Sequence, residues 1–221
     1  MPDVVDRFAA AQQLHRAGQV DQAEAGYRQV LEADPRHAAA WQMLGVLARD
    51  SGRLRESITY LEEGLHTVGP EATLYYQLGQ TYAATGDRDA ALRAYRLGLT
   101  LDEANAPAHL AVGQLLLARP ERHAAIQHFR RAIELEPDSQ DARFSLAVAL
   151  AEDEQTVAAE EAYRDLIELA PAHAAAHINL ASLVEQQGRL DEAIAGYRAA
   201  LVVDPRSWKA EFNLGSALAA R

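Results

Sequence analysis

The most regular feature of the sequence is a pattern of apolar positions that repeats every 34 residues. In the second period Trp41, Leu44 and Leu47 recur at the spacing of one helix face, not in the alternation of a strand. Residues 54–65 show the same helical spacing, and Gly52 between the two stretches can take the positive φ that ends a helix. One period therefore predicts two short antiparallel helices joined by a tight turn.

The period is kept through six copies without insertion or deletion. A row of large apolar residues lies in the predicted second helices: Tyr27, Leu61, Tyr95, Phe129, Tyr163 and Tyr197. A row of small residues lies in the first helices: Gly45, Gly79, Gly113, Ala147, Ala181 and Gly215. The small residues allow close helix approach, and the large ones fill the space between successive pairs. Because one pair buries too little surface to fold alone, the pairs must share a continuous core.

These patterns predict an all-α fold, a single solenoid spanning residues 1–221. We expect the repeats at 4–37, 38–71, 72–105, 106–139, 140–173 and 174–207, with a trailing helix at 208–221. Two copies replace the turn glycine, with Pro120 and Glu154, and proline suits the first turn of the next helix. The Trp41 position carries Arg7, His109, Arg143 and His177 in other copies, where we expect looser packing.

The spacing of Trp41, Leu44-Gly45, Gly52 and Leu61 resembles the tetratricopeptide repeat, as does that of Leu180-Ala181, Gly188, Ala193, Tyr197 and Pro205. This resemblance implies a right-handed superhelix of helix pairs whose first helices line a concave groove. It also implies a non-enzymatic scaffold that binds a peptide or protein segment in that groove.

The predicted groove is mostly neutral, with aromatic and amide side chains. Aromatic rings can bury a peptide's side chains, and amides can bond its backbone at both donor and acceptor. The candidate groove residues are Gln42, Tyr76, Gln77, Gln80, Gln114, Phe144, Ser145, Asn179, Ser182, Phe212 and Asn213.

Two comparisons within the resembled family sharpen this prediction. Co-chaperones of the family hold a terminal carboxylate with cationic residues, but the matching positions here carry no cation: Phe8, Gln12, Met43, Thr73 and Gln77. Asn179 and Asn213 instead resemble the asparagine ladder of O-GlcNAc transferases. Ala9, Met43 and Ala111 interrupt that ladder.

The formal net charge of −11 disfavours nucleic acid and anionic membranes as partners. The fifth repeat alone carries −6, which would attract a basic segment, so we expect a basic or neutral protein partner. The absence of cysteine excludes disulfides and thiolate chemistry. With no apolar signal or membrane-length segment, the default expectation is a cytoplasmic protein, and the excess of arginine over lysine suggests a bacterial source.

Catalytic and metal-binding patterns are nearly absent, so we expect no enzyme activity, metal or cofactor. His173 and His177 have a helical chelating spacing, but His173 is expected in a turn. No phosphate-binding loop or nucleophile elbow is found.

Two alternatives concern the trailing segment, which has the pattern of another first helix. The chain could be the substrate-recognition arm of a larger glycosyltransferase or sulfotransferase, because its opening resembles repeat arrays that precede such domains. The exposed apolar side of the trailing helix could also mediate self-association into a homo-oligomer.

Overall fold

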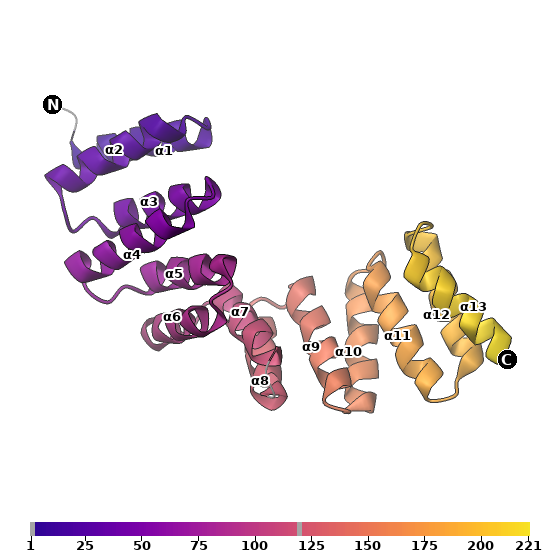
Figure 1. Ribbon diagram of the computed structural model, residues 1–221. Helices are drawn as coiled ribbons and strands as arrows, with labels where there is room; N and C mark the ends of the chain where they lie inside the picture. Colours follow the sequence, from indigo (N-terminus) through magenta and orange to yellow (C-terminus); the bar gives the residue numbers. More distant parts are fainter. Residues whose placement is uncertain (1–2, 119–120) are drawn as a thin grey trace. The chain divides into compact units, whose positions relative to one another are not determined.

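The structure is a computed structural model that describes residues 3–118 and 121–221 (Figure 1). Every regular element within these residues is an α-helix, which confirms the all-α prediction. The helices are α1 (Val4–Arg16), α2 (Val20–Ala33), α3 (Ala38–Asp50), α4 (Leu54–Val68), α5 (Ala72–Thr85), α6 (Arg88–Leu101), α7 (Ala106–Leu117), α8 (Arg122–Leu135), α9 (Gln140–Glu152), α10 (Thr156–Leu169), α11 (Ala174–Gln186), α12 (Leu190–Val203) and α13 (Trp208–Ala220). Pro120 lies outside the described residues.

The chain forms two compact units, Met1–Ala108 (unit 1) and His109–Arg221 (unit 2). In unit 1, α1 packs on α2, α2 on α3, and so on to α6 (Figure 1). In unit 2 the same succession runs from α8 to α13. Odd-numbered helices also touch each other, as α3 touches α5 and α11 touches α13. Each unit therefore has an odd-helix layer and an even-helix layer.

The turns within the helix pairs follow the predicted chemistry. Gly18, Gly52, Gly86 and Gly188 all have positive φ, between 72° and 84°. Glu154 takes the same left-handed conformation, with φ 59°, although it has a side chain. Its repeat therefore keeps the turn geometry without glycine, at a steric cost that glycine avoids.

Close packing between paired helices requires the predicted glycines. A Cβ added at Gly45 would lie 2.6 Å from the side chain of Leu61, and one at Gly113 would lie 2.5 Å from Phe129. Leu61 and Phe129 are fully buried, so neither could move aside into solvent. The rows of small and large residues thus form the contact between the two helices of a pair.

The Trp41 position has a hydrogen-bonding role that the apolar pattern did not reveal. The indole Nε1 of Trp41 donates to the carbonyl of Pro35 at 2.9 Å. Arg143 makes the equivalent bond to Pro137 at 2.8 Å, and His177 bonds to Pro171 at 2.9 Å. Looser packing was expected at these replacements, but each side chain still ties its helix to the preceding turn.

Candidate functional site

The predicted groove residues fall on odd-numbered helices of both units. In unit 1, Gln42 lies on α3, and α5 carries Tyr76, Gln77 and Gln80. In unit 2 the candidates are Gln114 on α7, Phe144 and Ser145 on α9, Asn179 and Ser182 on α11, and Phe212 and Asn213 on α13. The structure brings together two separate groups of them, one in each unit.

In unit 2, Asn179 and Ser182 line a pocket of about 230 Å³, here called the α11 pocket. Its lining residues are Ala151, Glu152, Tyr163, Asn179, Ser182, Leu183 and Gln186. The Asn179 amide Nδ2 donates to the Tyr163 hydroxyl at 3.3 Å, which leaves its carbonyl oxygen free to accept. The pocket therefore combines an amide, hydroxyls and a carboxylate with the apolar side chains of Ala151 and Leu183, a chemistry suited to a peptide backbone.

A second polar group, formed by Glu185 of α11 and Tyr197 of α12, adjoins the α11 pocket. The Tyr197 hydroxyl donates to the Glu185 carboxylate, with an oxygen–oxygen distance of 2.6 Å. Burial and this carboxylate raise the pKa of Tyr197, while side-chain hydrogen bonds from Ser182 and Asn213 lower it in part. Burial likewise raises the pKa of Tyr163. Both tyrosines therefore stay neutral hydrogen-bonding groups over the physiological pH range.

The other candidates in unit 2 differ in exposure. Phe144 is half-buried between Tyr163, at a ring separation of 6.3 Å, and His173, at 4.9 Å. Ser145 is half-buried and Gln114 is exposed. Phe144 thus supports the Tyr163 ring that forms a wall of the α11 pocket.

In unit 1, Gln77 and Gln80 are joined by a cation that the sequence analysis did not identify. The Arg49 guanidinium donates to the side-chain oxygen of Gln77 at 2.7 Å and to that of Gln80 at 2.8 Å. Gln42 is half-buried, whereas Tyr76 is 6% exposed and its hydroxyl donates to the carbonyl of Asp102. Tyr76 is therefore a packing residue with little surface for a ligand.

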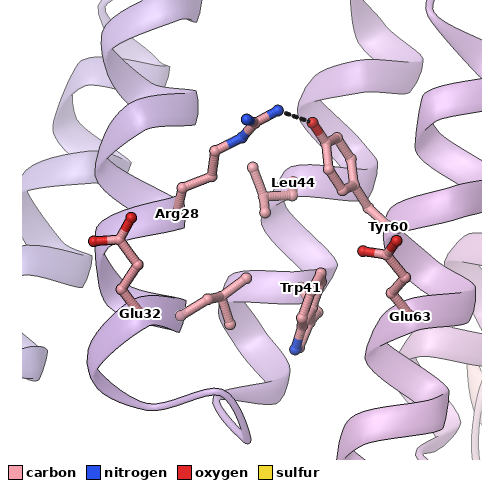
Figure 2. Close-up of a pocket in the computed structure, with 7 residues that line it drawn as sticks. Arg28, Glu32, Trp41, Leu44, Tyr60 and Glu63 are labelled. Atoms are coloured by element: carbon pink, nitrogen blue, oxygen red, sulfur yellow. Dashed lines mark hydrogen bonds between the residues drawn. The ribbon is translucent and has the colours of Figure 1, made fainter.

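Unit 1 also contains a larger hollow between its even-numbered helices, which no sequence pattern had indicated. This α2–α4 hollow has a volume of about 440 Å³ and is lined by Arg28, Leu31, Glu32, Trp41, Leu44, Tyr60 and Glu63. Figure 2 shows Trp41 and Leu44 on the floor, with Glu32 and Glu63 on opposite sides. Arg28 donates to the Tyr60 hydroxyl at one end (Figure 2).

The Arg28 end of the hollow belongs to a charge network that joins α2 to α4. Glu24 pairs with Arg28 at 2.7 Å and with Arg53 at 2.8 Å, and Arg53 also pairs with Glu56 at 2.9 Å. Burial raises the pKa of the Glu24 carboxyl, but hydrogen bonds from Arg53 and Tyr60 and the two positive charges lower it by more. The two arginines are therefore balanced by two carboxylates.

The same network recurs four repeat periods later in unit 2. Glu160 pairs with Arg164 at 2.7 Å and with Arg189 at 2.8 Å. Both arginines also contact Glu192. The hydrogen bond from Arg189 is the main cause that lowers the pKa of Glu160.

The outer face of α13 is apolar and exposed. Trp208 is 75% exposed and Phe212 69% exposed. A Cβ added at Gly215 would meet no atom within 4 Å, whereas Gly113 at the same register faces Phe129. Asn213, on the same helix, is half-buried near Tyr197.

The paired histidines have structural roles. His173 is the N-cap of α11, where its Nδ1 accepts from the backbone N–H of Ala176 at 3.1 Å, and His177 holds the carbonyl of Pro171. Among the residues that the structure describes, no group of three or more histidines and carboxylates is placed to hold a metal ion. None of the described helices is long and apolar enough to cross a bilayer.

The fold and these surfaces define a class of protein: an α-helical repeat protein built from antiparallel helix pairs. More specifically, the chain belongs to the tetratricopeptide repeat family. One tetratricopeptide repeat model matches residues 8–71, 110–174, 158–202 and 186–221, and a second matches residues 72–105.

Solved structures share this fold at low sequence identity. The protein YrrB, described as a TPR protein with an unusual peptide-binding site, is 20% identical with a TM-score of 0.77, over 84% of this chain and 96% of that one. MamA is 24% identical with a TM-score of 0.71, over 78% and 94%. PilF of Pseudomonas aeruginosa is 16% identical with a TM-score of 0.78, over 99% and 97%. The search of curated proteins found no match.

Several polar groups of the site were missed from sequence because they belong to positions interpreted as packing. The row tyrosines were assigned as apolar filler, yet the hydroxyls of Tyr163 and Tyr197 reach side chains of α11. The signal was their identity: Phe129 at the same register would fill space equally well without a hydroxyl. Arg49 and Glu185 lie one turn beyond the groove row that contains Val46 and Ser182.

Proposed function

We propose that the protein is a non-enzymatic interaction scaffold that binds an extended peptide or protein segment on its odd-helix layer. The observation that carries this proposal is the α11 pocket, where Asn179, Ser182 and the Tyr163 hydroxyl lie around one opening. Such groups can pair with the donor and the acceptor of a peptide backbone without selecting its sequence. That YrrB has a peptide-binding site on a similar fold supports the choice.

The charges around the pocket favour a basic or neutral segment. Glu152 lines the pocket and Glu185 lies one turn away on α11. Its lining contains no arginine or lysine. These carboxylates would strengthen the binding of a segment with one or two positive charges, and they would repel a terminal carboxylate.

The experiment is a selection from a random peptide display library on immobilised full-length protein, followed by affinity measurements on the enriched peptides. Asn179→Ala should weaken their binding by about tenfold, which corresponds to one lost buried hydrogen bond. Adding Gln80→Ala tests whether the polar group of unit 1 contributes as well. Neither change should lower the melting temperature by more than about 2 °C, because both side chains are outside the core.

The matched control is Gln127→Ala, which removes an exposed amide from α8 in the even-helix layer of unit 2. Its affinity should equal that of the wild type. An Asn179→Ala protein that binds the enriched peptides with wild-type affinity contradicts the assignment of the site.

A specific observation favours self-association as a second candidate function. Trp208 and Phe212 expose a contiguous stretch of apolar surface on α13, and exposed patches of this kind mark interaction sites. Sedimentation velocity at increasing concentration should show a dimer that Phe212→Ser converts to monomer. A wild-type protein that stays monomeric at every concentration rules this candidate out. The transferase-arm alternative stays a prediction.

A further inference from the structure

The α2–α4 hollow is lined by residues of α2, α3 and α4 in unit 1, and none of them lines the α11 pocket of the proposed function. We propose that it is a second binding site, which receives a single arginine side chain of a protein partner. The aliphatic stem would lie on Trp41, and the guanidinium would lie between Glu32 and Glu63. Because the two surfaces use different residues, either assignment can fail without the other.

The first argument is the charge left over in the hollow. Arg28 and Arg53 are balanced by Glu24 and Glu56, so that end of the hollow is locally neutral. The nearby Arg36 donates to the carbonyl of Val68 at the end of α4.

In contrast, the side-chain carboxylates of Glu32 and Glu63 have no hydrogen-bond or ion-pair partner anywhere in the described chain. Both side chains are exposed and lie on opposite sides of the hollow in Figure 2, and their negative charge favours a cation in the hollow.

The second argument is the shape and chemistry of the floor. Trp41 is half-buried, and its indole N–H is already bonded to Pro35, so the ring is held in place and presents an apolar face. Gly64 permits α4 to lie against it, since a Cβ there would be 2.8 Å from the Trp41 Cβ. An indole face attracts a guanidinium, which stacks on aromatic rings more readily than an ammonium does. This selects arginine over lysine.

The third argument comes from the other repeats, which show what the fold itself requires at these positions. The register position of Tyr60 is occupied elsewhere by Gly26, Ala94, His128, Ala162 and Gly196. At the Trp41 position Arg143 and His177 make the same structural hydrogen bond without an indole. At the Glu63 position unit 2 has Ala199 in the last repeat. The fold therefore needs neither the tyrosine, the tryptophan nor the second carboxylate that build the hollow.

The volume is consistent with one large side chain rather than a whole peptide. About 440 Å³ is at the lower end of the size of small-ligand sites. A long amphipathic side chain buries its stem and keeps its charged end near polar groups. The neighbouring residues of the partner would lie across the α2 and α4 surfaces.

The test measures the fluorescence of Trp41 in full-length protein carrying Trp208→Phe, which leaves Trp41 as the only tryptophan. The probe is the peptide acetyl-Gly-Leu-Arg-Leu-Gly-amide, compared with the same peptide carrying neutral citrulline for arginine. We expect a saturable change with Kd of about 1 mM or tighter at low salt for the arginine peptide, weakening as salt rises. The citrulline peptide should bind at least about tenfold more weakly.

Glu32→Gln with Glu63→Gln should weaken the arginine peptide at least about tenfold. The matched control is Glu168→Gln, the counterpart of Glu32 four repeats later, which should leave Kd unchanged.

The proposal is overturned if the arginine and citrulline peptides bind equally, or if binding does not saturate up to about 10 mM. It is also overturned if the variant with both glutamates replaced has an unchanged Kd. Free L-arginine binding as tightly as the peptide would overturn the assignment to a protein partner. If the double variant fails to fold, the comparison of the arginine and citrulline peptides, made on protein that keeps Glu32 and Glu63, tests the proposal by itself.

Discussion

The α2–α4 hollow of unit 1 and its register counterpart in unit 2 share a charge network but not a binding surface. Glu24, Arg28 and Arg53 correspond to Glu160, Arg164 and Arg189, and both sets join neighbouring even-numbered helices. Around this common network, Trp41, Tyr60 and Glu63 in unit 1 are replaced by His177, Gly196 and Ala199. The network is thus part of the scaffold, whereas Trp41 and Tyr60 have no aromatic counterpart at the matching positions of unit 2, His177 and Gly196.

The odd-helix layers show the reverse difference. Asn179, Ser182 and Gln186 of the α11 pocket correspond to Met43, Val46 and Asp50 in unit 1. Unit 2 therefore has its polar pocket on the odd-helix layer, while unit 1 has its larger hollow on the even-helix layer. One repeated scaffold can present different chemistry on different layers, because most positions outside the packing rows are free to vary.

Side-chain size explains why the last repeat has glycine, and not tyrosine, at the Tyr60 position. A Cβ added at Gly196 would lie 2.8 Å from the Cβ of Ala181 on the facing helix. In the second repeat the position of Ala181 is occupied by Gly45, and there the position of Gly196 carries Tyr60. A large residue at this position of the even-numbered helix thus requires glycine at the facing position of the odd-numbered helix.

The largest expected effect comes from forcing the tyrosine into unit 2. Gly196→Tyr should lower the free energy of unfolding by about 3 kcal/mol, because the new side chain overpacks the contact with Ala181. Thermal unfolding followed by circular dichroism measures it. Adding Ala181→Gly should recover more than half of the lost stability. A double variant no more stable than Gly196→Tyr alone would show that the contact with residue 181 does not limit the size of residue 196.

A smaller effect is expected from the opposite change. Tyr60→Gly should cost about 2 kcal/mol, since it removes a partly buried ring and places glycine within α4. Tyr60→Phe removes the hydroxyl that contacts Arg28 and Glu24 and should cost about 1 kcal/mol or less. Urea unfolding of both variants gives the comparison, and equal losses would show that the hydrogen bonds, not the ring, dominate.

The smallest effect concerns the shared network and its dependence on pH. The pKa of Glu24 and that of Glu160 are lowered in the folded protein, so both carboxylates bind protons more weakly than in the unfolded chain. Their stabilisation is complete above about pH 5 and is lost as the pH falls through the folded-state pKa. Glu24→Gln should therefore cost about 1 kcal/mol at pH 7 and less at pH 3, where the carboxylate begins to bind a proton.

Glu160→Gln should show the same sign and the same pH window, because its partners occupy the same register. Urea titrations at pH 7 and pH 3 measure both variants. A loss that is equal at the two pH values in either variant would mean that packing, and not ion pairing, is the contribution of the network.

The helices could be predicted from sequence because the same signals recur over six periods. Gly52 and its equivalents mark the turns, and Gly45 with Leu61 marks the helix contact, so local and repeated information agree. Glu154 could be recognised as a turn residue only because four other repeats have glycine at the same position.

The candidate site was predicted less completely, for a physical reason. A hydroxyl such as that of Tyr163 is placed by the whole packing of its ring, and the apolar pattern does not say where the oxygen lies. The α2–α4 hollow depends on Arg28, Trp41 and Tyr60 from three helices in two repeats, and no single repeat contains it. Arg49 was missed because a cation that bonds two glutamines on the next odd helix leaves no mark in the periodicity.

The central claim, that unit 2 binds a peptide on its odd-helix layer, is tested most directly by locating a bound peptide. The measurement is the chemical-shift change of backbone and side-chain amides in isotope-labelled protein titrated with a peptide selected from the display library. We predict the largest shifts at Asn179, Ser182 and Gln186 of α11, with small shifts on the exposed faces of α10 and α12. Shifts concentrated on α10 and α12, with the Asn179 amide unmoved, would contradict the claim.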